Sequence, residues 1–258
     1  MEKKAKIIAT LGPAIYNENK LKQLVNLGVD AFRINFSHNT NGISKIVSKI
    51  RKIEKNTRKK ISLIADLQGV KLRVGKIKDD GQKIRFNQKF IFDNNSEIGN
   101  EKRITFAYPK VLKKLNKGNK ILIDDGKFIF IVTKKIGNSI VTVCKSQNCF
   151  MKSNKSVHIQ NVDIAFNKLT SKDKLDIKSA IKLGCNWIAL SYIQNEKLIY
   201  EARKLINKDM GIISKIENKH ALKNIVNIIK ASDSIMIARG DLAIDIGHSE
   251  VPKVQLSL

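Results

Sequence analysis

The sequence has few cysteines and lacks a long hydrophobic run. Its three cysteines, Cys144, Cys149 and Cys185, are odd in number and form neither a Cys-x-x-Cys pair nor the spacing of a zinc site, so we expect reduced thiols. Gly12-Pro13 ends the first apolar run before it could serve as a signal peptide, and no stretch of about 18 apolar residues follows. These absences predict a soluble, cytoplasmic protein with no membrane partner.

Acidic side chains are also scarce, because 23 Asp and Glu stand against 49 Lys and Arg and leave a formal net charge of +26. Such an excess ordinarily indicates nucleic acid or an anionic membrane surface as the partner. Here only 8 of the 49 basic residues are Arg, the lysines are spread in ones and twos, and no basic run is interleaved with aromatic residues. We therefore expect no nucleic-acid partner.

Two stretches of the chain alternate short apolar strands with amphipathic helices. Their hydrophobic spacing predicts strands at 6–11, 31–38, 61–66, 187–193, 211–217 and 234–240. It predicts helices at 17–27, 42–54, 171–183, 196–206 and 219–230, with a further helix starting near 249. Thr170 or Ser171 is the expected N-cap of the helix at 171–183. This alternation is typical of a βα barrel or a doubly wound sheet.

Between residues 70 and 159 the pattern changes to short alternating runs broken by Gly, Asn and Asp, which predicts an inserted all-β domain. Asp124-Asp125-Gly126 is a hairpin signal within it. We expect a first barrel part at 1–69, a cap domain at 70–159 and a second barrel part at 160–258. Without the insertion, about 168 residues remain, fewer than the roughly 250 of a closed eight-stranded barrel, so the sheet is either open or an incomplete barrel.

Polar side chains recur at the ends of the predicted strands. Lys215 and Glu217 lie two residues apart near one strand end, so both should project from the same face. One interpretation is a cation and a metal ligand aimed at a single small volume. The other is a solvated or mutually paired ion pair without a function. Arg33, Asn35 and Ser37 alternate with apolar residues, which suits a strand whose polar face reaches a ligand.

Five motifs together resemble the pyruvate kinase family, and they occur in the family's order. They are Ala9-Thr10-Leu11-Gly12-Pro13, Arg33-Ile34-Asn35-Phe36-Ser37-His38, Ala65-Asp66-Leu67-Gln68-Gly69, Ile213-Ser214-Lys215-Ile216-Glu217-Asn218 and Ile235-Met236-Ile237-Ala238-Arg239-Gly240-Asp241-Leu242. The resemblance covers essentially all 258 residues. It implies an α/β fold with six of the eight units of a TIM (β/α)8 barrel and an all-β cap domain inserted after the third strand. We expect the family's seventh and eighth strands and its C-terminal domain to be missing.

The same resemblance implies transfer of a phosphoryl group from phosphoenolpyruvate to ADP, giving pyruvate and ATP in glycolysis. Lys215 and Arg33 match the family's catalytic residues that bind the phosphoryl group, and the family's lysine at the position of Lys215 also stabilises the developing enolate. Gly240 and Asp241 match the backbone N–H groups that bind the substrate carboxylate. Glu217 and Asp241 match the ligands of Mg²⁺, a hard ion that prefers oxygen donors.

A monovalent-cation site is implied as well. Asn35, Ser37, Asp66 and the backbone carbonyl of Leu67 match its ligands. Lys71 stands where many family members have glutamate, and members with lysine there resemble the subgroup that works without K⁺. We therefore expect that the ammonium of Lys71 replaces the ion and that K⁺ is not required.

Asn35, Arg73 and Lys155 match nucleotide contacts, so phosphoenolpyruvate and ADP or ATP are the expected ligands. The family forms homo-oligomers, and the sequence leaves the oligomeric state open. An alternative function also stays open: a truncated, catalytically inactive chain that retains at most ligand or partner binding. The first and sixth strands of an open barrel would leave unpaired edges that a partner could cover.

Three shorter patterns have ordinary explanations. His38 follows Ser37, but adjacent strand residues face opposite ways, which argues against the nucleophile and base of a serine hydrolase. Arg239-Gly240-Asp241 matches an adhesion tripeptide by chance. Asp124 and Asp125 are expected to be turn residues.

Overall fold

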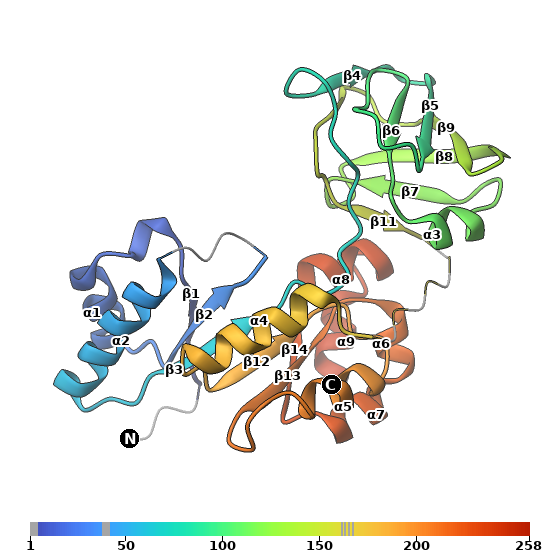
Figure 1. Ribbon diagram of the computed structural model, residues 1–258. Helices are drawn as coiled ribbons and strands as arrows, with labels where there is room; N and C mark the ends of the chain where they lie inside the picture. Colours follow the sequence, from blue (N-terminus) through green and yellow to red (C-terminus); the bar gives the residue numbers. More distant parts are fainter. Residues whose placement is uncertain (1–4, 38–41, 161, 163, 165, 167) are drawn as a thin grey trace. The chain divides into compact units, whose positions relative to one another are not determined.

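The computed structural model describes residues 5–37, 42–160, 162, 164, 166 and 168–258, so His38 lies outside the described residues. The chain divides into two compact units, Met1–Val70 with Phe166–Ala238 and Lys71–Ala165 with Arg239–Leu258. The first unit holds the predicted βα alternation (Figure 1). The second holds the predicted β module together with the last two helices.

The first unit is built on one six-stranded parallel sheet. Its strands are β1 (Ile8–Thr10), β2 (Ala31–Asn35), β3 (Ser62–Asp66), β12 (Trp187–Leu190), β13 (Gly211–Ile216) and β14 (Ser234–Ile237). They lie side by side in chain order, and every neighbouring pair is parallel. A doubly wound sheet would reverse its strand order part-way, whereas a barrel does not. The fold is therefore an incomplete barrel, with β1 and β14 at its two ends among the described strands.

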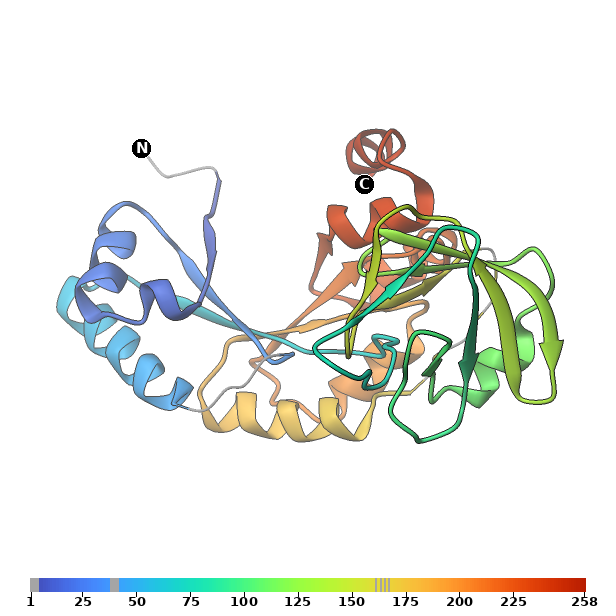
Figure 2. The same ribbon diagram turned by 90° about the horizontal axis from the view of Figure 1, so that it is seen from above.

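Helices connect these strands and pack on one face of the sheet. They are the 3₁₀ helix η1 (Pro13–Ile15), α1 (Glu18–Asn26), α2 (Ile43–Thr57), α4 (Ser171–Lys182), α5 (Lys197–Arg203), α6 (Lys219–Lys223) and α7 (Ile225–Ala231). Figure 2 shows α2 and α4 along the same side of the sheet. Thr170 is the N-cap of α4, as predicted, and forms a capping box with Asp173.

Several predicted boundaries differ from the observed ones, and two of these differences change how an element is described. The helix expected at 219–230 is two helices that meet at Asn224, whose side chain donates to the carbonyl of Gln194 (2.8 Å), a contact from outside the helix. The strand expected to reach Gly240 ends at Ile237, and Gly240 already lies in helix α8 (Arg239–Ile246) of the second unit.

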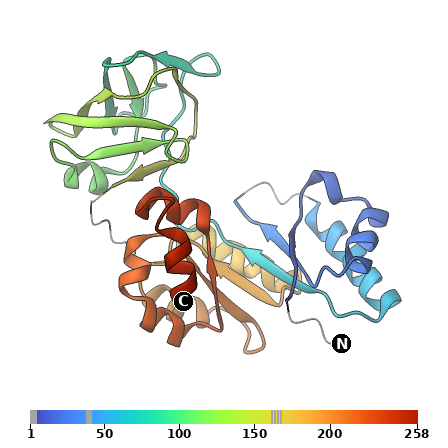
Figure 3. The ribbon, with the colours of Figure 1, turned by 180° about the vertical axis from the view of Figure 1, so that it is seen from behind.

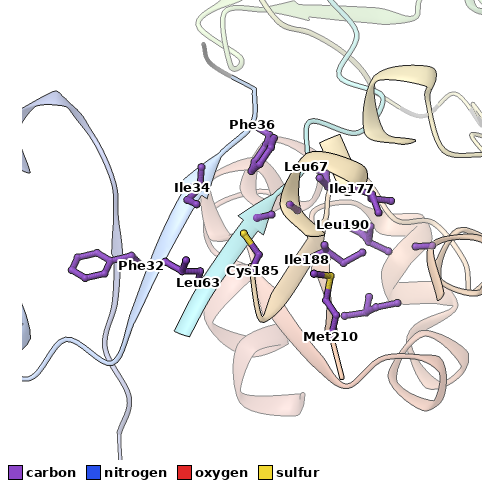
Figure 4. Close-up of a cluster of buried hydrophobic side chains, with 14 of the residues drawn as sticks. Phe32, Ile34, Phe36, Leu63, Leu67, Ile177, Cys185, Ile188, Leu190 and Met210 are labelled. Atoms are coloured by element: carbon purple, nitrogen blue, oxygen red, sulfur yellow. The ribbon is translucent and has the colours of Figure 1, made fainter. Parts of the chain in front are cut away.

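The large hydrophobic core of the first unit lies between the sheet and its helices. Alternate strand residues such as Phe32, Leu63 and Ile188 are fully buried there, in the same cluster as Ile177 of α4 (Figure 4). A period of two along each strand puts the intervening residues on the opposite face. That face carries a second, smaller cluster of Ala31, Ile64, Ala189 and Ile213, with Trp187 and Met236 packed against it.

The second unit contains a six-stranded sheet and a two-stranded one. Its elements are β4 (Gln82–Ile84), β5 (Lys89–Asp93), β6 (Arg103–Thr105), α3 (Pro109–Lys114), β7 (Lys120–Ile123), β8 (Phe128–Ile136), β9 (Ser139–Cys144), β10 (Cys149–Met151), β11 (Val157–Ile159), α8 and α9 (Val251–Ser257). Strands β7 and β8 form the hairpin predicted at Asp124-Asp125-Gly126 (Figure 3). All three turn residues have positive φ. An all-β module had been predicted, but the module also contains the short helix α3.

Candidate functional site

Polar side chains collect at the carboxyl ends of the parallel strands in the first unit. The face that carries Ala31, Ile64 and Ile213 lower down carries Arg33, Asp66 and Lys215 two residues later. The side chains thus change from apolar to charged along the same face of three strands. In barrels, residues at this end of the strands form the functional site.

Lys215 is the centre of this group. Its side chain is 11% exposed, and its ammonium lies 2.8 Å from Glu217 Oε1 and 3.3 Å from Asp66 Oδ1. It also donates to Ser191 Oγ at 2.8 Å. Burial alone lowers the pKa of Lys215, but the Glu217 and Asp66 carboxylates outweigh burial and raise that pKa above its ordinary value. Lys215 is therefore a fixed positive charge at the strand ends.

Arg33 adds a second cation to the same cluster. Its Nε donates to Asp66 Oδ2 at 2.6 Å, and its Nη2 forms an ion pair with the same oxygen. Nη1 donates to Thr10 Oγ1 at 3.0 Å. Asp66 thus joins Arg33 and Lys215, and the two cations balance the charges of Asp66 and Glu217.

Glu217 is held by backbone as well as by Lys215. Its Oε2 accepts a hydrogen bond from the backbone N–H of Tyr192 at 2.5 Å. Tyr192 has φ +56°, in the left-handed region that costs a non-glycine residue free energy. Backbone strain of this kind often occurs at functional sites. The strained turn after β12 directs an N–H group toward the Glu217 carboxylate.

We expect Tyr192→Gly to be about 1 kcal/mol more stable than Tyr192→Ala, because only glycine adopts this φ without a steric penalty. Urea denaturation followed by Trp187 fluorescence would measure the difference. Tyr200, in helix α5 and 54% exposed, is the control: there the glycine variant should be the less stable one by about the same amount. The same order of stability at both positions would contradict the prediction.

The residues predicted for a monovalent cation lie on β2, β3 and the turns that follow. Asn35 Oδ1 accepts from the backbone N–H of Ser37 at 3.0 Å. The carbonyl of Leu67 accepts from the Ser191 hydroxyl at 2.7 Å. Together with the ion pairs of Asp66, these contacts show that each of the four predicted ligand residues has a partner within the chain.

The remaining predicted residues belong to the second unit. Arg73 donates from Nη1 to the carbonyl of Asn154 at 2.8 Å and forms an isolated antiparallel bridge with Ser156. Lys155 pairs with Asp124 at 2.7 Å. Arg73 and Lys155, both predicted to contact nucleotide, therefore lie on adjoining segments.

Lys71 and Asp241 also meet in the second unit. The ammonium of Lys71 lies 3.6 Å from Asp241 Oδ1 and 3.6 Å from Asp125 Oδ1. Asp125 and Asp124 are turn residues, as predicted, but each also forms an ion pair. Gly240 precedes Asp241 in the first turn of α8, and nothing lies within 4 Å of where its Cβ would be.

Ser191 and Tyr192 were not among the predicted site residues. Both follow β12 directly, so their position at a strand end was the available signal. Over the residues that the structure describes, no group of three or more His, Cys, Asp or Glu side chains is arranged to hold a metal ion. Within the same residues, no helix is both long and apolar enough to cross a membrane.

The chain is similar in sequence to curated pyruvate kinases. A pyruvate kinase of Methylorubrum extorquens is 34% identical over 254 residues, which are 98% of this chain and 53% of the relative. Pyruvate kinases of Geobacillus stearothermophilus and Clostridium perfringens are 31% and 30% identical over 99% of this chain, and 44% and 55% of their own lengths are covered. The chain thus spans about half the length of these relatives.

The model of the family described as "Pyruvate kinase, barrel domain" matches residues 2–258. Its match includes the strands that carry Arg33, Asp66 and Lys215 as well as the inserted β module. Because this match extends over nearly the whole chain, the protein belongs to the pyruvate kinase family.

Proposed function

We propose that the chain carries the phosphoryl-transfer site of a pyruvate kinase, which moves a phosphoryl group from phosphoenolpyruvate to ADP and yields pyruvate and ATP. The observation that supports this most is the buried ammonium of Lys215, held between two carboxylates at the carboxyl ends of barrel strands. A fixed cation in a site shielded from water stabilises the negative charge that develops on a phosphoryl group and an enolate.

Each proposed role follows from the chemistry of the side chain. Arg33 and Lys215 would bind the phosphoryl oxygens, because both cations are already oriented by Asp66. Gly240 and Asp241 would bind the substrate carboxylate through their N–H groups in the first turn of α8.

Mg²⁺ is the proposed metal, and Glu217 and Asp241 are its proposed ligands. Their carboxylate oxygens are the hard donors that Mg²⁺ prefers, so the chemistry of this donor pair fits the ion. When bound, Mg²⁺ would offset the charge of the phosphoryl oxygens. The chain itself holds Glu217 in place through Lys215 and the N–H of Tyr192.

Further proposals concern the cation, the nucleotide and the domains. Asn35, Arg73 and Lys155 would contact nucleotide phosphates, and the Asn35, Ser37, Asp66 and Leu67 group would be the monovalent-cation site. Lys71 would make added K⁺ unnecessary. The proposed domains are 1–69, 70–159 and 160–258, and the proposed setting is cytoplasmic, with a homo-oligomer as the family's assembly.

A second candidate is a chain that binds ligand or partner without catalysis. It is favoured by the strand order, which leaves β1 and β14 at the ends of an unclosed sheet over the described part of the chain. Edges of this kind present unpaired backbone groups to another chain.

A coupled pyruvate-release assay on the 258-residue chain distinguishes the two candidates. We expect little turnover from this chain alone but measurable binding of phosphoenolpyruvate with Mg²⁺ by calorimetry, unchanged when NaCl is replaced by KCl. Near-normal turnover would rule out the non-catalytic candidate, and binding that needs K⁺ would contradict the role proposed for Lys71.

Arg33→Gln should weaken phosphoenolpyruvate binding at least about tenfold, because it removes a charge-assisted hydrogen bond to the phosphoryl group. Lys52→Gln is the matched control. It removes the same charge from a side chain that is 65% exposed and pairs with Glu18 on α1. Equal effects of both variants would indicate that only net charge matters and would contradict the proposed site.

A further inference from the structure

We infer that Ser191 is a positioning residue that fixes the direction of the Lys215 ammonium. This inference rests on the proposed function, since it concerns the same phosphoryl-binding site. A lysine side chain is flexible and its ammonium has no preferred plane, so its direction must come from the acceptors around it. Over the residues that the structure describes, Ser191 supplies the one uncharged acceptor of that ammonium.

The Lys215 ammonium donates one hydrogen bond and forms two ion pairs. Its Nζ carries three N–H groups. It donates to Ser191 Oγ at 2.8 Å and pairs with Glu217 Oε1 at 2.8 Å and Asp66 Oδ1 at 3.3 Å. Each partner comes from a different strand end. Removing Ser191 leaves the two ion pairs, which do not fix the direction of the ammonium, because attraction between opposite charges depends on their distance.

The Ser191 hydroxyl has a single proton, and its neighbours decide where that proton points. Ser191 accepts from Lys215 and has a carbonyl acceptor, that of Leu67, at 2.7 Å, while Asp66 lies farther away at 3.3 Å. A hydroxyl donates one hydrogen bond, and the shorter contact to Leu67 is the better one. The hydroxyl is thus oriented by the turn after β3 and presents its lone pair to Lys215.

Ser191 itself has little freedom to move. It is 5% exposed, and Gly69 packs on its backbone so closely that a Cβ at Gly69 would lie 2.6 Å from the Ser191 carbonyl oxygen. Gly69 is held in turn by a hydrogen bond from its N–H to the buried carboxylate of Asp173 (3.0 Å). The support is therefore rigid enough to orient a flexible side chain.

Ser191→Ala tests the inference, and Ser214→Ala is the matched control. Ser214 is the residue before Lys215 and is fully buried, but its hydroxyl lies 2.7 Å from that of Ser232 and is not among the contacts of Lys215. Both variants lose one buried hydroxyl and should lose similar stability. Ser191→Thr keeps the hydroxyl and serves as the rescue variant.

Two measurements report on the direction of the ammonium. The first is the order of the Lys215 ¹⁵Nζ resonance by NMR, assigned by its absence in Lys215→Arg. The second is the dissociation constant for phosphoenolpyruvate with Mg²⁺. We expect Ser191→Ala to make the Lys215 ammonium more mobile and to raise the dissociation constant about tenfold. A tenfold change corresponds to the loss of one strong hydrogen bond. Ser214→Ala should leave both unchanged, and Ser191→Thr should restore both.

An equally ordered Lys215 ammonium in Ser191→Ala would overturn the inference. So would an unchanged dissociation constant, or equal effects of Ser214→Ala. If the wild-type chain binds no phosphoenolpyruvate, but Ser191→Ala still mobilises Lys215, the proposed function fails and the positioning role of Ser191 stands.

Discussion

Lys215→Met should lower the free energy of unfolding of the first unit by about 3–5 kcal/mol, which is the usual cost of removing one partner from a buried ion pair. Asp66 and Glu217 are each 2% exposed, so water cannot replace the lost ammonium around them. The methionine is similar in volume and leaves little cavity. The cost therefore comes from uncompensated negative charge, and denaturation followed by Trp187 fluorescence would measure it.

The double variant Lys215→Met with Glu217→Gln separates charge from packing. Neutralising Glu217 removes much of the uncompensated charge, so the double variant should be more stable than Lys215→Met alone. Glu217→Gln alone should cost less, because Lys215 keeps Asp66 as its partner. A double variant no more stable than Lys215→Met would show that packing, and not charge, causes the loss.

Phe130→Ala should destabilise the second unit by about 3–5 kcal/mol, the range for removing a buried aromatic side chain. Phe90, Phe92 and Phe130 are fully buried, and their ring centroids lie 5.4 to 5.5 Å apart. Each ring thus packs on the other two, and deletion of one leaves a cavity that the sheet cannot easily close. Circular dichroism during thermal unfolding would detect the loss.

Phe32→Ala is the matched control, because Phe32 is equally buried but belongs to the first unit. The single tryptophan, Trp187, also lies in the first unit and reports on that unit alone. We expect Phe32→Ala to shift the fluorescence transition and Phe130→Ala to leave it in place. Equal fluorescence shifts in both variants would mean that the two units unfold as one.

The sheet of the first unit could be predicted strand by strand. Each strand is an apolar run with a turn signal after it, and the predicted ranges contain all six observed strands. Whether the sheet was open or part of a barrel depended on strand order, which residue spacing does not encode.

The site was predictable only in part, for a related reason. Lys215 and Glu217 form the expected pair because two residues along a strand define a shared face. Two partners of this pair, Ser191 and Tyr192, were not predicted. They come from the end of β12, which lies beside β13 through a tertiary contact. The left-handed backbone of Tyr192 could not be predicted, since tyrosine rarely adopts that conformation.

The bridge between Arg73 and Ser156 has a consequence for how the chain reaches its native state. Pairing of β3 with β12 must close a loop that includes Lys71–Ala165, the larger part of the second unit. If that unit folds first, the bridge brings its entry and exit segments together and shortens the effective loop to roughly a third. Closing the shorter loop costs about 1 kcal/mol less entropy, so early folding of the insertion should speed assembly of the parallel sheet around it.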